Sequence, residues 1–520
     1  MNKNRKALLL YPKFPENSFW NFRYINSLFL RPGEFGEPKG NMPPLGILCL
    51  APVMAKKYGR ENITIIDLNN RILYDEDIAA ADDIYISAML TQRVSFQEIV
   101  TRARKMGKTI IAGGPYVSED LPGLDHIFIN EADLNFEKFL DDFFQGKADR
   151  IYKSDRKPTP EEFLMPDYSY INIHNYTTMA VQFSRGCPHD CDFCDITQRF
   201  GRKMRTKNID NVMAELDQLY DLGWRLQVMF IDDNFIGKPS EALELLDELI
   251  PWQKARNYPF EFFTQASVLL AEKQYEGLLK SLAPAGFSMI FLGIETPNEN
   301  SLRESNKMHN LKPGLTLPEK IRRIQEIGQL MILGGFIVGF DSDTHGIFEE
   351  QIDFIKDIKL PNPMITLLNP LPDTKLRKRL VLENRLHDGV LGDVAGATEV
   401  AYIPLKMTAS ELIMGYRKVL ESVYLKMDEF YRRCENSLKH IAVKQGSLPV
   451  NLEGVKSLVC IIIEQGIKSD YRRSFWRYFI RNAFLYPNKL EYILRWSAYG
   501  LHYNRLARKL VAGEANLEYC

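Results

Sequence analysis

The chain has 520 residues, of which 26% are charged and 45% hydrophobic, and its formal net charge is −1. This balance excludes a globally basic surface for nucleic acid, and the length predicts two to four domains. We find no secretory signal pattern and no apolar run long enough to cross a bilayer, so we expect a cytoplasmic protein with four reduced, scattered cysteines, Cys49, Cys434, Cys460 and Cys520.

Residues 1–150 alternate between strand and helix patterns. Buried-strand patterns cover residues 6–11, 63–68, 83–88 and 108–112, and helical patterns cover residues 44–55 and 95–105. This alternation predicts a doubly wound parallel sheet, in which ligands bind beyond the carboxyl ends of the strands. Those ends carry residues 87–91, 113–116 and 130–131, and a plain turn after each strand is the alternative interpretation.

A polar, proline-bearing stretch over residues 151–175 predicts a connector, after which a strand over residues 178–183 delivers a loop with three cysteines. Cys187, Cys191 and Cys194 have the spacing C-x3-C-x2-C. Thiolates are the ligands of iron–sulfur clusters, and three of them leave one iron of a four-iron cubane open. A zinc site would need His189 as a cramped fourth ligand, and a disulfide would leave one thiol over. We therefore predict a three-cysteine [4Fe–4S] cluster.

Residues 176–385 repeat a strand–helix unit six times. A full eight-unit barrel needs about 250 residues, so the pattern predicts a partial (β/α)6 barrel with one side open to a large substrate or a second cofactor. Polar residues follow the strands at the carboxyl edge, where barrel active sites form: Asp232, Asp233, Asn234, Gln265 and Glu295. Capped turns and charged strand ends are the alternatives for these groups. We interpret Arg303 and Lys307, on the loop after the fourth strand, as surface charges, and contact with an anionic group is the alternative.

Residues 386–520 show helical patterns without strands, so we expect a mainly helical domain. Helices are predicted over residues 409–427 and 455–466, followed by a basic, aromatic stretch over residues 471–509. We favour amphipathic helices whose cationic side chains cover apolar surface, and peripheral membrane contact is the alternative. No motif supports contact with RNA.

The cysteine spacing, with the aromatic Phe193 just before the last cysteine, resembles the radical S-adenosylmethionine superfamily. The segments Met-Pro-Pro-Leu-Gly, Ile-Ser-Ala-Met-Leu-Thr-Gln and Ala-Gly-Gly-Pro-Tyr of the N-terminal region resemble the cobalamin-binding domain of its cobalamin-dependent branch. With its helical C-terminal extension, the chain resembles the methyltransferase subfamily that includes hopanoid C-2 methylase and the bacteriochlorophyll side-chain methylases. The motifs Phe-Ile-Asp-Asp-Asn-Phe-Ile-Gly and Gly-Ile-Glu-Thr-Pro carry that resemblance into the barrel.

The resemblance implies three cofactors and their residues. The [4Fe–4S] cluster would be held by Cys187, Cys191 and Cys194. S-adenosylmethionine would be bound by Phe193, Asp232, Asp233, Asn234, Gln265, Glu295, Thr296, Val338 and Leu371. Cobalamin would be bound by Pro44, Leu45, Ser87, Met89, Leu90, Thr91, Gln92, Gly113, Gly114, Pro115, Tyr116 and Glu131. The chain lacks an Asp-x-His-x-x-Gly motif, so the lower cobalt face is expected to have no histidine ligand.

The resemblance also implies the reaction. A methyl group would pass from S-adenosylmethionine through methylcobalamin to an unactivated carbon, after a 5′-deoxyadenosyl radical has removed a hydrogen atom. A rearrangement or cyclisation without methyl transfer is the alternative, and a non-enzymatic cofactor carrier is a third class. We expect an electron donor such as flavodoxin or ferredoxin. The substrate could be a lipid, a tetrapyrrole, a small metabolite or a protein side chain, and no catalytic acid or base is assigned.

Overall fold

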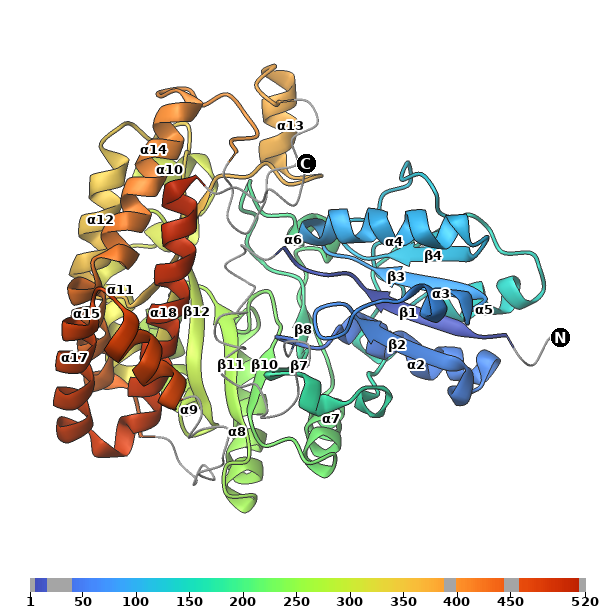
Figure 1. Ribbon diagram of the computed structural model, residues 1–520, viewed down its shortest axis with the longest axis horizontal. Helices are drawn as coiled ribbons and strands as arrows, with labels where there is room; N and C mark the ends of the chain where they lie inside the picture. Colours follow the sequence, from blue (N-terminus) through green and yellow to red (C-terminus); the bar gives the residue numbers. More distant parts are fainter. Residues whose placement is uncertain (1–4, 16–39, 388–398, 444–457, 514–520) are drawn as a thin grey trace.

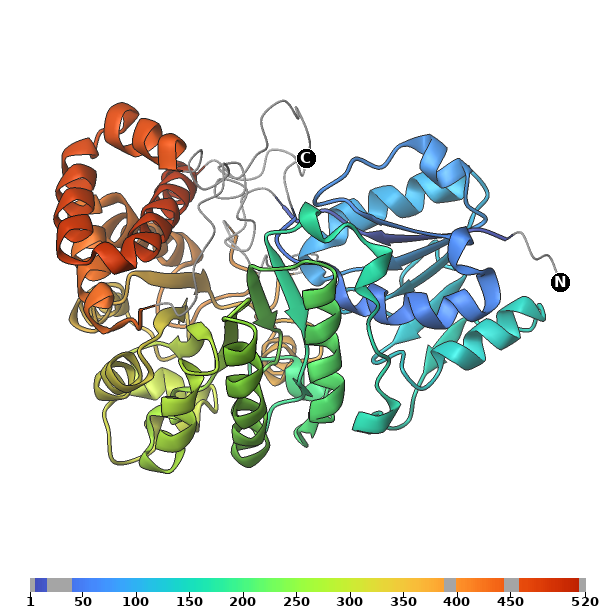
Figure 2. The ribbon, with the colours of Figure 1, turned by 90° about the horizontal axis from the view of Figure 1, so that it is seen from below.

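A computed structural model covers the chain and describes residues 5–15, 40–387, 399–443 and 458–513. Figure 1 shows three parts side by side: an α/β domain at the N-terminus, a central barrel, and a layer of C-terminal helices. Figure 2, seen from below, places the C-terminal helices on the side of the barrel away from the N-terminal domain. This arrangement confirms the predicted fold class.

The N-terminal domain is built on a parallel sheet with the strand order β2-β1-β3-β4-β5-β6. Its strands are β1 (Ala7–Tyr11), β2 (Ile63–Asp67), β3 (Asp83–Ser87), β4 (Thr109–Gly113), β5 (His126–Ile129) and β6 (Ile151–Lys153). Its helices are α2 (Leu45–Tyr58), α3 (Asp75–Ala79), α4 (Arg93–Lys105) and α5 (Phe136–Phe144). Separate buried clusters lie on the two faces, with Leu8 and Leu10 in one and Ala7 and Leu9 in the other, because successive side chains of a strand alternate between faces.

The first four strands agree with the predictions, whereas β5 and β6 were not predicted. β6 falls inside the predicted connector and has three residues, of which only Tyr152 is buried. The rest of the connector is packed rather than loose, since Tyr168 is fully buried and its hydroxyl donates to the carbonyl of Ala180. The connector therefore attaches the N-terminal domain to the first barrel strand.

The central domain is a six-stranded parallel sheet with the order β14-β13-β12-β11-β10-β7. Its strands are β7 (Thr178–Val181), β10 (Gln227–Phe230), β11 (Glu261–Ala266), β12 (Phe287–Glu295), β13 (Met331–Val338) and β14 (Asn362–Leu367). Within the described residues the edge strands β7 and β14 do not pair with each other, so the barrel is partial, as predicted. A small hairpin, β8 (Ser184–Arg185) with β9 (Arg205–Thr206), brackets the cysteine loop.

Helices follow the barrel strands along the chain. They are α6 (Ile196–Arg199), α7 (Ile209–Asp221), α8 (Pro239–Ala255), α9 (Glu276–Leu282), α10 (Glu299–Glu304), α11 (Leu317–Gly328), α12 (Ile347–Asp357) and α13 (Lys375–Leu382). Local chemistry sets several of their starts. At α11, for example, the Thr316 side chain accepts from the Glu319 amide while the Glu319 carboxylate accepts from the Thr316 amide, which satisfies two donors of the first turn.

The C-terminal part is helical, as predicted. It contains α14 (Ala409–Leu420), the π-helical turn η10 (Glu421–Leu425), α15 (Met427–His440), the π-helical segment η11 (Ile462–Lys468), α17 (Arg472–Leu485) and α18 (Leu490–Ala512). The predicted helix over residues 409–427 ends instead in η10, and residues 455–457 of the next one lie outside the described residues. In the part of the chain that the structure describes, no helix is both long and apolar enough to span a bilayer.

Candidate active site

The cysteine loop is held in shape by a tight backbone turn. Gly186 has φ +96°, and a Cβ there would lie 2.8 Å from the carbonyl oxygen of Gly201, so only glycine fits. The amide of Cys187 donates to Gly201 and that of Cys194 donates to the carbonyl of Cys191. Burial raises the pKa of all three thiols, that of Cys191 to about 11. A partly buried loop with three thiols suits a site that binds iron rather than a reactive free cysteine.

The geometry of the three thiols bears on which metal centre they could hold. All three cysteines are free, and the described residues contain no group of three His, Cys, Asp or Glu side chains placed to hold one metal ion. A zinc site needs its ligands gathered around a single ion. In a cubane each thiolate binds its own iron atom, so the ligands stay apart. Three thiols on one short loop are the donor set of the predicted cluster, in which the fourth iron has no protein ligand.

Three polar residues after β10 hold the start of this loop. Asp232 is fully buried and accepts hydrogen bonds from the amides of Phe183 (3.1 Å) and Ser184. Asn234 is also buried, and its side chain accepts from the Ser267 amide at 3.3 Å. Asp232 also accepts from the Ser184 hydroxyl, and the Asn234 side chain also hydrogen-bonds the Cys187 thiol. Both are therefore positioning residues for the loop.

Asp233, between them, differs because it lines the cavity. Its carboxylate accepts from the Gly186 amide at 3.2 Å, and burial raises its pKa to about 7. Gln265 and Leu371 line the same cavity, at the ends of β11 and β14. Of the residues predicted for S-adenosylmethionine, these three are the ones that line the cavity.

Glu295, at the end of β12, forms a buried ion pair with Lys307. The Lys307 Nζ lies 2.6 Å from the Glu295 carboxylate, and both side chains are nearly inaccessible to water. Burial alone would lower the pKa of Lys307, but the facing carboxylate and the cysteine thiols raise it overall. The interpretation of Lys307 as a surface charge is therefore wrong, whereas Arg303 is exposed and pairs with Glu299 at 3.0 Å.

Other groups surround this pair. The Lys307 Nζ is 5.9 Å from the centre of the Phe193 ring, and that ring packs edge-on against Phe340. The ring of His189, in the cysteine loop, stacks on His309 at 3.7 Å. Thr296 and Val338 are buried, and among the described residues that line the cavity neither they nor Phe193 and Glu295 appear. Lys307 thus supplies a positive charge between the cysteine loop and β12, which no local sequence pattern revealed.

The N-terminal sheet faces the same space with the carboxyl ends of its strands. The order β2-β1-β3 reverses direction at β1, and ligands of such sheets bind at the crevice outside β1 and β3. Gly114 has φ +96°, and a Cβ there would lie 2.8 Å from the Ala88 carbonyl oxygen, so a glycine is required where the chain turns at this edge. Of the residues predicted for cobalamin, the following line the cavity: Pro44, Leu45, Ser87, Met89, Leu90, Thr91, Gly113, Gly114, Pro115, Tyr116 and Glu131.

Gln92 is the exception, because its side chain faces the protein. It is 1% exposed, its amide nitrogen donates to the Pro12 carbonyl, and its oxygen accepts from the Met89 amide at 2.8 Å. These bonds tie the short helix η3 (Leu90–Gln92) to the end of β1. They leave Met89, which is 44% exposed, at the cavity wall. Gln92 is therefore a positioning residue for the Met89 loop.

Glu131 lines the cavity, but its carboxylate is committed to two arginines of the β8–β9 hairpin. It accepts from Arg185 at 2.8 Å and from Arg205 at 2.9 and 3.0 Å, and Arg185 also pairs with Asp133 at 2.8 Å. The Phe163 ring lies 4.1 Å from the Arg185 guanidinium. We call these five residues the interdomain clasp. It joins the end of β5 to the hairpin that carries the cysteine loop, and neither arginine was predicted.

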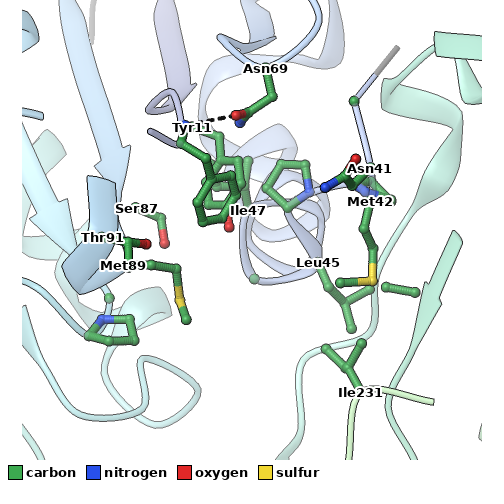
Figure 3. Close-up of a pocket in the computed structure, with 18 of the residues that line it drawn as sticks. Tyr11, Asn41, Met42, Leu45, Ile47, Asn69, Ser87, Met89, Thr91 and Ile231 are labelled. Carbon is green, nitrogen blue, oxygen red and sulfur yellow. Dashed lines mark hydrogen bonds between the residues drawn. The ribbon is translucent and has the colours of Figure 1, made fainter. Parts of the chain in front are cut away.

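The two sheets open onto a single cavity of about 2970 Å³. Ordinary small-molecule pockets measure about 300–1,000 Å³, so this one has room for more than one large ligand. Figure 3 shows Met89 from the N-terminal sheet projecting into it, and Leu45 pointing toward Ile231 at the end of β10. Cys194 lies in the same wall as Asp233. The cavity is therefore shared between the N-terminal domain and the barrel.

Comparison with known proteins agrees with this architecture. Residues 181–359 match the model of the radical SAM superfamily, and residues 374–516 match a domain of unknown function. The chain is 33% identical to an uncharacterized methyltransferase of Synechocystis, over 96% of this chain and 91% of that protein. It is 28% identical to the hopanoid C-2 methylase of Rhodopseudomonas palustris, over 99% and 95% of the two chains. The structure of the radical S-adenosylmethionine methyltransferase TsrM from Kitasatospora setae, with cobalamin and a [4Fe-4S] cluster bound, superposes with a TM-score of 0.58 at 13% identity, over 98% of this chain and all of that one.

Proposed function

This chain belongs to the cobalamin-dependent radical S-adenosylmethionine methyltransferases, and we propose that it transfers a methyl group by way of a corrinoid to an unactivated carbon of an apolar substrate. We assign the corrinoid to residues 1–150, the cluster and S-adenosylmethionine to the barrel of residues 176–385, and a supporting role to residues 386–520. Rearrangement without methyl transfer is not favoured, because the relatives and the solved structure described above are named for methylation.

The shared cavity carries the proposal. Cys194 and Asp233 lie on its barrel side, while Ser87, Met89 and Gly114 lie on the side of the N-terminal sheet. Both sets of residues stand at carboxyl ends of parallel strands, where ligands of such sheets bind. A methyl carrier in one sheet and a radical source in the other would then face the same substrate.

The cofactors supply the hard chemistry when bound: the cluster provides the electron that cleaves S-adenosylmethionine, and the corrinoid carries the methyl group. Cys187, Cys191 and Cys194 would hold the cluster and leave one iron open. Asp233, a carboxylate that faces the cavity beside the loop, would attract the amino group of S-adenosylmethionine. Its neighbours Asp232 and Asn234 would keep the loop in place.

Glu295 and Lys307 would act together on the rest of that molecule. Lys307 holds the buried Glu295 side chain in one orientation at the end of β12. A carboxylate fixed in this way can accept two ribose hydroxyls. Phe193, Gln265, Thr296, Val338 and Leu371 would complete the surroundings.

On the corrinoid side the chain supplies shape rather than a metal ligand. The backbone at Gly113 and Gly114 lies open to a bulky ring, and Met89 forms part of the wall. We propose that no histidine reaches the lower cobalt face and that residues of the Met89 loop stand there instead. The buried side chain of Gln92 keeps that loop in place.

The proposed reaction also requires a substrate and an electron donor. We propose a lipid or a tetrapyrrole as substrate, and a one-electron donor such as flavodoxin or ferredoxin. α17 exposes Ile480, Phe484 and Leu485, of which Phe484 is 85% accessible, beside the exposed Arg477 and Arg481. The two arginines pair with Asp428 and Glu435 of α15 at 3.4 and 3.6 Å, so the exposed apolar ridge is the main feature that suits a membrane surface. This would bring the enzyme to a membrane-bound substrate.

Anaerobic reconstitution tests the proposal. The protein, supplied with iron, sulfide, a corrinoid and a strong reductant, should show a cubane spectrum and convert S-adenosylmethionine to 5′-deoxyadenosine. Cys191→Ala should abolish that conversion, whereas Cys460→Ala, a matched change outside the loop, should not. Zinc in place of iron, or conversion that survives Cys191→Ala, would contradict the proposal. A product that gains no methyl group would support rearrangement instead.

A further inference from the structure

The shared cavity extends through the barrel to the C-terminal domain. Six residues of α18 line it: Leu490, Glu491, Leu494, Arg495, Ala498 and Tyr499. Their spacing along the chain places all six on one side of the helix. Figure 1 shows α18 beside the barrel strands, and the ion pair between Arg495 and Glu261 fixes it to the start of β11. One face of α18 is thus a wall of the cavity at the end opposite the cysteine loop.

The barrel interior between the two ends is mainly apolar. Met229, Phe263, Phe291 and Met364 line the cavity from four different strands, and Leu494 and Ala498 continue this lining on α18. Glu261 and Gln265, at opposite ends of β11, both line the cavity. Four residues of strand span about 13 Å, so the cavity continues for about that depth below the reaction end. That depth is more than a methyl acceptor group alone would need.

The charges at the far end are already paired. Arg495 lies 2.6 Å from the Glu261 carboxylate and 2.7 Å from that of Glu491. Arg225, at the start of β10, donates to the carbonyls of Tyr220 and Trp224, and its guanidinium lies 3.7 Å from the centre of the Tyr220 ring. The Arg495 guanidinium is therefore neutralised by two carboxylates, and one nitrogen of the Arg225 guanidinium is used by backbone carbonyls. This end offers little to the carboxylates of a tetrapyrrole side chain.

We propose that the barrel interior and the Glu491–Tyr499 face of α18 bind the body of a neutral, rigid or long-chain lipid, whose reacting carbon lies at the cysteine end. Residues 374–516, which match a family model without an assigned function, then serve as the far wall of the substrate site. The inference rests on the proposed methyl transfer, because only that reaction places a substrate in this cavity. It narrows the substrate from lipid or tetrapyrrole to a neutral lipid.

The test measures lipid binding to the full chain, reconstituted with cluster and corrinoid. The neutral polycyclic probe is dehydroergosterol, titrated by energy transfer from the protein tryptophans, of which Trp224 lines the cavity. The anionic probe is zinc protoporphyrin. Ala498→Trp fills the far end of the site, and Leu494→Gln makes its wall polar without adding bulk. Ala512→Trp, exposed at the end of the same helix, is the matched control.

We expect wild-type protein to bind dehydroergosterol saturably, with a Kd of about 10 μM or tighter, and each cavity variant to weaken binding about tenfold or more. The control should bind as wild type does. Should Ala498→Trp fail to fold, as its thermal melt would show, Leu494→Gln decides alone. Unchanged binding in a folded variant, no saturable binding by wild type, or equally tight zinc protoporphyrin binding that the same changes weaken would overturn the inference. Formation of 5′-deoxyadenosine in the same preparation tests the proposed function separately.

Discussion

The interdomain clasp offers the sharpest stability test. Glu131→Gln removes one negative charge from a side chain that is 4% accessible, where Arg185 and Arg205 are 11% and 9% accessible. Arg185 keeps Asp133, but Arg205 loses its only carboxylate partner among the ion pairs of the described residues. Breaking one side of a buried ion pair typically costs about 3–5 kcal/mol, so we expect a loss of that size.

The assay is urea unfolding followed by far-UV circular dichroism and by release of the cluster. The matched control is Glu119→Gln, which breaks an exposed ion pair with Lys153 and should cost about 1 kcal/mol or less. Because the clasp holds the hairpin on either side of the cysteine loop, Glu131→Gln should also release the cluster at lower urea. Equal midpoints for the two variants would refute the reasoning.

Three further changes should have defined effects. Gly114→Ala introduces a Cβ 2.8 Å from a carbonyl oxygen at φ +96°, so thermal melts should show a loss of about 2 kcal/mol or more in folding stability. Gly107→Ala, at a glycine with positive φ but open space around it, should cost about 1 kcal/mol. Similar losses for the two variants would argue against the close contact at Gly114. Phe484→Ser should weaken binding to anionic phospholipid vesicles about tenfold in co-sedimentation. Leu382→Ser, which changes an exposed leucine of α13, should leave vesicle binding unchanged. Equal effects of the two changes would exclude α17 as the membrane contact. Burial raises the pKa of Asp343 to about 6, above its unfolded value of 3.8, so the folded state favours the neutral carboxyl group. The stabilisation from this group is therefore fully present below about pH 4 and is lost as the pH rises to about 6. Asp343→Asn should remove about 3 kcal/mol of this pH dependence, and an unchanged slope between pH 4 and 6 would contradict the assignment.

The sequence was sufficient for the main architecture, because each barrel strand is a buried apolar run followed by a helix. It was insufficient for β6, whose three residues bury only Tyr152. It also missed the break after α14, since a π-helical turn has no distinct residue signature in this chain. The partial barrel was predicted from the number of strand–helix units. That number can be counted without knowing the residue at which each unit ends.

The site was predictable where chemistry lies in one short segment, as in the loop from Cys187 to Cys194. It was not predictable where side chains meet across long separations. Lys307 is 12 residues from Glu295 and looks like any surface lysine until the fold buries it. Glu131 and Arg185 come from different domains, so no spacing rule links them. Local patterns name the residues that face a ligand more readily than those that hold them in place.

The cavity that joins the two sheets is the centre of this account, and it implies that one methyl group crosses from corrinoid to substrate. The most direct measurement supplies S-adenosylmethionine with a deuterated methyl group to reconstituted enzyme and a neutral lipid extract, with and without corrinoid. We expect a lipid product that carries the deuterated methyl group, formed only with corrinoid and accompanied by 5′-deoxyadenosine. Labelled product formed at full rate without corrinoid, or 5′-deoxyadenosine with no labelled product, would contradict it.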